Sequence, residues 1–81
     1  MTDHKALPVK GYTEQSDANI KTVNDNKKIE ERVLRQLDRM TEDKNLDQRM
    51  IALARTNVQE AFMWANRAVF QPERIDLDEG D

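Results

Sequence analysis

The sequence contains no cysteine, a single histidine, and only two glycines and two prolines. Without cysteine the chain can form neither a disulfide nor a thiolate metal site. The one histidine, His4, stands near the start of the chain, and no Glu-x-x-His, P-loop or glycine-rich phosphate motif occurs. Carboxylates are plentiful, but nothing in their spacing demands a catalytic site, so the candidates for metal-dependent or nucleophilic catalysis are poor. We expect a protein that is not an enzyme and that uses no metal or cofactor.

Long hydrophobic runs and strand-like alternation are also absent. No run approaches about 18 apolar residues, so we expect no membrane-spanning segment and no membrane partner. The opening MTDHKALPVKGY has no apolar core of signal-peptide length, so we expect a cytoplasmic protein. With 81 residues, 37% hydrophobic and 36% charged, the chain is too polar to build a large monomeric core. Chains of this kind usually gain stability by oligomerisation.

Two segments with helical periodicity predict an all-α fold, an antiparallel two-helix hairpin. The first helix spans roughly residues 17–43, with Ser16 or Asp17 as its N-cap. The second spans roughly residues 47–70 and stops before Pro72. In the connection, Asn45 suits a left-handed turn and Asp47 can cap the second helix. The chain then divides into an N-terminal arm, 1–15, a hairpin domain, 16–72, and an acidic tail, 73–81.

The second helix is apolar on more sides than a hairpin can cover. Helical spacing places on one face Met50, Ile51, Ala54, Val58, Ala61, Phe62, Ala65, Ala68 and Val69. Ala52, Met63 and Phe70 point the opposite way. One partner helix covers only one face, so the surplus predicts self-association. The single tryptophan, Trp64, is then an anchor in the core or in an interface rather than a platform for a ligand.

The apolar stripe of the first helix is interrupted. Its members are Ile20, Val23, Ile29, Val33, Leu34, Leu37 and Met40. From Ile29 onward the stripe is clean, but Asn26 and Glu30 project into it. This interruption indicates a bend, a polar contact across an interface, or a ligand site.

Basic residues are available in the body of the chain although its net charge is −3. The tail 73–81 holds five of the 16 acidic residues and one of the 13 basic ones, which leaves residues 1–72 with 11 acids, 12 bases and a net charge of about +1. Lys27 and Lys28 can meet phosphates or simply form a solvated helix face. No dense polybasic block occurs, so we expect no DNA or RNA polymer as a partner.

Three further residues are candidates for ligand contacts. Tyr12 follows Gly11, and its ring can stack on a nucleobase or latch the arm onto the hairpin. Arg67 shares a helix face with Met63 and Thr56. If that face is buried in an assembly, Arg67 needs an anion, either a carboxylate or a phosphate.

Three stretches together resemble the small phage anti-CBASS proteins that act as cyclic-oligonucleotide sponges, whose hairpin domain is shared with phage anti-Thoeris sponges. They are LPVKGYTEQS, NDNKKIEERVLRQLD and IALARTNVQEAFMWANRAVFQPERI. The resemblance covers about residues 6–77. It implies a compact homohexamer in the host cytoplasm that sequesters cyclic nucleotides without cleaving them.

The resemblance also implies two kinds of site. Tyr12 and Lys27, with Lys28 as a rival because the lysine is doubled, would bind a cyclic dinucleotide at a protomer interface. Arg67, with Thr56 as a companion, would belong to a separate pocket for cyclic trinucleotides. Other functions stay open: a sponge for glycocyclic ADP-ribose-type signals, a cyclic-nucleotide hydrolase, or a helical module that binds a host protein.

Overall fold

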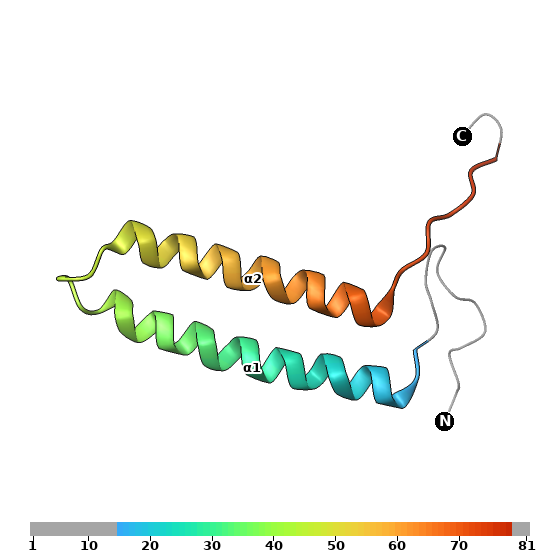
Figure 1. The fold of residues 1–81 in the computed structure, drawn as a ribbon, viewed down its shortest axis with the longest axis horizontal. Coiled ribbons are helices and arrows are strands. Elements are labelled where there is room, and N and C mark those ends of the chain that lie inside the picture. The colour runs from blue at the N-terminus through green and yellow to red at the C-terminus, as the bar shows by residue number, and fades with distance from the viewer. Residues whose placement is uncertain (1–14, 79–81) are drawn as a thin grey trace, which may run out of the picture.

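The computed structural model describes residues 15–78, in which two α-helices lie antiparallel and side by side (Figure 1). α1 spans Asp17–Thr41 and α2 spans Gln48–Phe70. The residues described contain no strand. The predicted all-α hairpin is therefore confirmed, and both helices end within two residues of the positions expected from the sequence.

Both helices begin at side-chain caps that the sequence predicts. The hydroxyl of Ser16 accepts a hydrogen bond from the backbone N–H of Asn19 at 3.1 Å. The carboxylate of Asp47 accepts one from the backbone N–H of Met50 at 3.0 Å. Each cap satisfies one of the backbone donors that the first turn of a helix leaves without a partner.

The end of α2 and the connection between the helices differ in how they turn. At the end of α2, Gln71 adopts a left-handed conformation with φ 44° and donates its N–H to the carbonyl of Arg67 at 2.7 Å. Among the described residues other than glycine, only Gln71 has a positive φ. The prediction of a left-handed Asn45 is therefore wrong. Instead the carboxylate of Asp43 accepts the Asn45 N–H at 3.0 Å, which closes the connection without that conformation.

The core between the helices is small. Over residues 15–78, the buried hydrophobic side chains are Val23 and Leu37 from α1 and Ile51 from α2, with 5%, 7% and 5% of their surface exposed. Full burial of such a side chain contributes about 1.5–3 kcal/mol. The burial of three such side chains contributes much less free energy than the loss of conformational entropy of two long helices costs on folding.

The stripe of α2 that meets α1 is narrower than the sequence pattern indicates. Its partly or fully buried members are Ile51, Ala54, Arg55, Val58, Phe62, Asn66 and Val69. Met50, which was placed on this face, is 64% exposed. The small residues Ala61, Ala65 and Ala68 are exposed too, whereas Phe70 is partly buried rather than opposite the hairpin. The wider set fails because a single neighbouring helix covers only a limited arc of α2.

The interruption in the α1 stripe is a polar contact between the helices, one of the three predicted explanations. The side-chain amide of Asn26 donates to the amide oxygen of Asn66 at 3.0 Å, and both residues are partly buried. The stripe is not clean beyond this point, because Ile29 is 47% and Val33 36% exposed.

Two further contacts join the helices near their ends. Arg55 of α2 donates to the carboxylate of Asp38 of α1 at 2.7 Å. At the other end the side-chain amide of Gln15 donates to the backbone carbonyl of Phe70 at 2.9 Å. The chain therefore enters α1 beside the point where it leaves α2 (Figure 1).

Candidate ligand-binding surfaces

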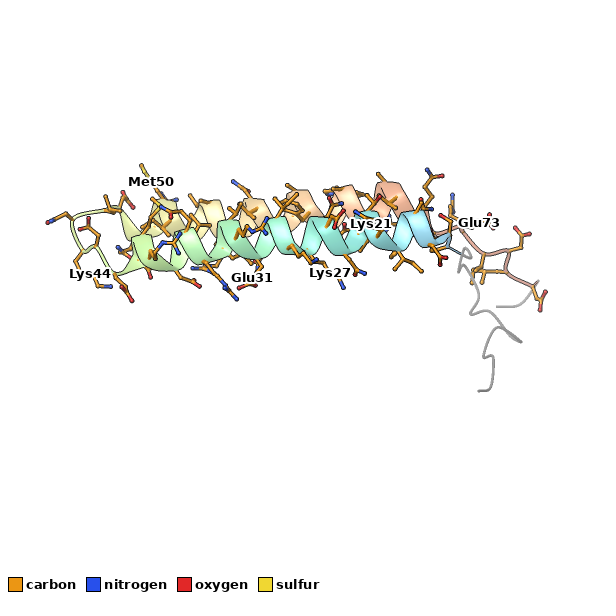
Figure 2. The ribbon with its side chains drawn as sticks, turned by 90° about the horizontal axis from the view of Figure 1, so that it is seen from below. Lys21, Lys27, Glu31, Lys44, Met50 and Glu73 are labelled. Atoms are coloured by element: carbon orange, nitrogen blue, oxygen red, sulfur yellow. The ribbon has the colours of Figure 1, made fainter. Side chains whose placement is uncertain are left out.

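A two-helix hairpin is a single layer, and its two faces carry different chemistry. Lys27 and Glu31 project from one side of the layer and Met50 from the other (Figure 2). We call the side of Lys27 and Glu31 the charged face and the side of Met50 the apolar face. The salt bridge between Arg55 and Asp38 lies on the charged face. Both residues are rotated away from the centre of the buried stripe toward the side of Lys27.

The apolar face has large side chains from both helices. Successive helical residues rotate by about 100°, which places on the side of Met50 the residues Ile29, Val33, Ala61, Trp64 and Ala68, with Leu53 at the outer edge of α2. Four of these side chains have about half or more of their surface exposed: Ile29 47%, Met50 64%, Leu53 50% and Trp64 57%. A surface of this kind, wide and apolar across two helices, is typical of a protein–protein interface.

The charged face and outer edge of α1 carry a shallow depression of about 300 Å³. Its lining consists of Lys27, Lys28, Glu31, Arg32 and Arg35. These residues recur at intervals of one, three and four, which places them on one side of the helix. The structure therefore brings the two predicted lysines together and adds two arginines to them. We call this surface the α1 cationic depression.

Three of the four cations of the α1 cationic depression form no ion pair within residues 15–78. Arg35 donates to the Glu31 carboxylate at 2.9 Å. Lys27, Lys28 and Arg32 make no hydrogen bond or ion pair with any described residue. Four cations against one carboxylate leave an excess of three positive charges in a chain whose net charge is −3.

Lys21, the cation that precedes the depression along α1, is paired with an acidic residue. Lys21 donates to the Asp25 carboxylate at 2.8 Å, which raises the pKa of Lys21 and lowers that of Asp25. Lys28 also lowers the pKa of Asp25 by its charge, a smaller effect than the hydrogen bond. The α1 cationic depression therefore begins one turn after a neutralised pair, and its charge is confined to the middle of α1.

Thr56 and Arg67 lie on α2, away from the α1 cationic depression. Both are exposed, on the outer edge of the helix and about three turns apart. Met63 lies between them on the same side and is 53% exposed. The guanidinium of Arg67 stands 5.8 Å from the centre of the Trp64 ring, a cation–π contact. Within one protomer the described residues of the two predicted pockets are thus on different helices: Lys27 and Lys28 on α1, Thr56 and Arg67 on α2.

Tyr12 lies outside the described residues, as do residues 79–81 and all other residues of the arm except Gln15. The segment after α2, residues 72–78, leads away from the hairpin and exposes Ile75 and Leu77 (Figure 1).

The two arginines in the α1 cationic depression, Arg32 and Arg35, are the candidates that the sequence reasoning passed over. On a helix surface, basic residues such as these usually form a solvated face. The available signal was spacing: Arg32 follows Lys28 by four residues and Arg35 follows Lys27 by eight, so all four share a side of the helix. That signal does not separate a binding surface from a solvated one, because both produce the same pattern.

Two other searches of residues 15–78 gave negative results. No cluster of three or more His, Cys, Asp or Glu side chains is placed to hold a metal ion. Neither α1 nor α2 is long and apolar enough to cross a membrane.

Comparison with known proteins identifies the family. The family model described as "Acb2/Tad1, hairpin domain" matches residues 4–70, most of the 81-residue chain. No curated protein and no solved structure matches this chain. The matched segment contains the N-terminal arm from residue 4 and all of α1 and α2. The chain therefore belongs to the Acb2/Tad1 hairpin family, which implies a sponge-type role in phage anti-defence.

Proposed function

We propose that this protein binds and sequesters cyclic di- and trinucleotide second messengers in the host cytoplasm, without cleaving them, and thereby blocks CBASS antiphage signalling. The observation that carries the proposal is the α1 cationic depression, with three cations that have no acidic partner among residues 15–78. In a member of a sponge family, such a surface calls for an anionic ligand. A sponge acts by mass action, so it must bind free messenger tightly, but it needs no chemistry.

The cyclic-dinucleotide site is proposed to consist of Tyr12, Lys27 and Lys28. The ring of Tyr12 stacks on a base, and a lysine ammonium meets a phosphate as a point charge. Both lysines line the depression, which supports the pair without choosing between them. Its volume of about 300 Å³ is small and open on one hairpin. A ligand enclosed on several sides needs walls from another copy of the chain.

We propose that the hairpins assemble through the apolar face, and the number six, a homohexamer, is what the family resemblance implies. Val23, Leu37 and Ile51 are the only buried hydrophobic side chains within residues 15–78, while the apolar face exposes Ile29, Met50, Leu53 and Trp64. A second copy of the chain is the simplest cover for this face. Neighbouring copies then bring Arg67 and Thr56 of one α2 toward other protomers, where a cyclic trinucleotide supplies the phosphate that the Arg67 guanidinium binds.

Calorimetric titration with 3′,3′-linked cyclic dinucleotides and with cyclic trinucleotides tests the proposal. We expect heat of binding for at least one ligand of each class. Tyr12→Ala should abolish dinucleotide binding while leaving the oligomer intact, and Arg67→Ala should weaken trinucleotide binding only. Arg49→Ala is the matched control, because Arg49 is exposed on α2 and no candidate site includes it. No heat with any of these ligands would refute the proposal.

Two alternatives each have an observation in their favour. The family description names Tad1 beside Acb2. Likeness to the anti-Thoeris sponges of this family favours a glycocyclic ADP-ribose-type signal as the ligand. That ligand should then compete with cyclic dinucleotides in the titration. The apolar face favours a module that binds a host protein. Such a module is captured with a host protein from lysate and releases no nucleotide when heated.

The proposal that the protein does not cleave its ligand has its own test. After saturation with a cyclic dinucleotide, the complex is digested with a protease and the released small molecules are analysed. Intact cyclic ligand is expected. Linear product would replace the sponge by a cyclic-nucleotide hydrolase.

A further inference from the structure

We propose that Arg32, acting with Lys28, binds a second phosphate of the cyclic dinucleotide, so that the α1 cationic depression holds both phosphodiester groups of one ligand. This inference rests on the proposed function and assigns a role to a residue that is not among its site residues.

The spacing along α1 supplies two separate positive centres. Lys28 and Arg32 are four residues apart, hence on one side of the helix and about 6 Å apart along its axis. Lys27 precedes Arg32 by about 7.5 Å along the axis and lies nearer the buried stripe. The depression that these residues line is continuous, so a ligand with two phosphates can meet Lys27 with one and the Lys28–Arg32 pair with the other.

Arg32 has the chemistry and the freedom for this contact. Its guanidinium presents a planar fork of N–H donors that matches two phosphate oxygens, which a lysine ammonium cannot do. No described residue accepts a hydrogen bond from it, and its side chain is exposed. Arg32 is therefore a donor set that no partner within residues 15–78 uses.

Glu31 and Arg35 limit the extent of the site. Glu31 is the only acidic residue of the depression, and it is occupied by Arg35 at 2.9 Å. Without Arg35, an unpaired Glu31 carboxylate would face the incoming phosphate and repel it. Arg35 thus neutralises the one repulsive group of the lining, while Arg32 contacts the ligand directly.

The length of the strip favours a small ligand over a nucleic-acid polymer. From Lys27 to Arg35 the lining extends about 12 Å along the helix. The cation preceding it, Lys21, is neutralised by Asp25. A polymer-binding surface follows the backbone over many phosphates, whereas this strip has charge for about two.

Calorimetry with a 3′,3′-linked cyclic dinucleotide at several salt concentrations tests the inference. Arg32→Gln should weaken binding at least tenfold and make Kd less dependent on salt, because it removes one charge that faces the ligand. Arg32→Lys should restore the salt dependence but only part of the affinity, because it keeps the charge and loses the fork. Arg49→Gln on α2 removes the same charge elsewhere and should change Kd less than twofold.

The outcomes separate this inference from the proposed function. If the wild-type protein binds the ligand and Arg32→Gln behaves as Arg49→Gln does, the role of Arg32 is refuted and the sponge function stands. If the wild-type protein binds no cyclic nucleotide, both are refuted. A short single-stranded DNA oligonucleotide that binds as tightly as the cyclic dinucleotide, and with the same loss in Arg32→Gln, would overturn the assignment in favour of a polymer surface. Far-UV circular dichroism of each variant must match the wild type, so that a loss of binding is not a loss of fold.

Discussion

Trp64 is the side chain through which self-assembly of the hairpin can be tested most sharply. It is the only tryptophan of the chain, it lies on the apolar face, and 57% of it is exposed in one protomer. If a second copy covers the apolar face, Trp64 is buried in the assembly. Trp64→Ala then removes a large part of the interface while keeping a strong helix former in α2.

The expected magnitude follows from the exposed area. A tryptophan side chain buries up to about 250 Å², so the exposed part of Trp64 leaves about 140 Å² for an interface. At roughly 25 cal/mol per Å² this area is worth about 3.5 kcal/mol per protomer. Fixing the ring on association reduces the gain to about 2 kcal/mol, which is a loss of roughly 30-fold in association for Trp64→Ala.

Sedimentation velocity over a dilution series measures this loss, and the tryptophan fluorescence of the wild-type protein reports the same event. The emission of the assembled wild type should be blue-shifted and should move to the red as dilution dissociates it. Gln59→Ala is the control, because Gln59 is an exposed residue of α2 that lies toward the charged face. It should leave the sedimentation profile unchanged.

Two results would refute this reasoning. One is a Trp64→Ala protein that assembles as tightly as the wild type. The other is a wild-type emission that stays red-shifted at every concentration, which would show that the tryptophan is never covered.

Three further predictions concern the single hairpin, all measured at one fixed protomer concentration because assembly shifts the apparent stability. Asn26→Ala should lower the free energy of unfolding by about 1 kcal/mol, because it leaves the partly buried Asn66 amide oxygen without its partner. The double variant Asn26→Ala, Asn66→Ala should lose less stability than the sum of the two single losses. Strict additivity in thermal unfolding would contradict the contact. Asp47→Ala should lower stability by about 1 kcal/mol through loss of the α2 N-cap, whereas Asp47→Ser should retain most of it, and equal melting temperatures of the two variants would argue against capping. The pKa of Asp25 is lowered in the folded protein, first by its hydrogen bond from Lys21. Its contribution to folding stability is therefore full above the unfolded carboxyl pKa of about 3.9 and is lost as the pH falls through the lower folded pKa. Asp25→Asn should flatten the acid limb of a circular dichroism titration, and an unchanged limb would contradict the pairing.

The helices and their starts were predictable from the sequence because their signals are local. Ser16 and Asp47 are followed by long periodic segments, and a cap acts within three residues of its own position. The conformation of the connection was less accessible. Asn45 is a residue that accepts a left-handed turn, but Asp43 satisfies its N–H from a neighbouring position, and no propensity of Asn45 alone reveals this.

The rotation of α2 against α1 was predicted only in part. Apolar spacing identifies Ile51 as buried but also assigns Met50 to the same face, where it does not lie. Met50 is rotated by about 100° from its neighbour Ile51, which takes it outside the arc that α1 covers. Asn66 does lie in the stripe, where its amide oxygen accepts a hydrogen bond from Asn26 of α1. A polar residue placed in the stripe by a contact from the other helix is invisible to a hydrophobic pattern.

The candidate site shows the same limit. Lys27 and Lys28 were selected from the sequence, and the structure places both in one depression. Arg32 was not selected, because a basic residue on a helix surface has the same local pattern whether it binds a phosphate or water. Two features seen in the structure combine at Arg32: it lines the same depression as Lys27 and Lys28, and no described residue accepts a hydrogen bond from it.

Mass spectrometry of heat-released small molecules tests the sponge function most directly. The purified protein is exposed to a mixture of cyclic di- and trinucleotides, washed, and heated, and the released molecules are compared with those from a Tyr12→Ala, Arg67→Ala double variant treated in the same way. We expect intact cyclic di- and trinucleotides from the wild-type protein and neither from the variant. Linear products, or no nucleotide from the wild type, would contradict it.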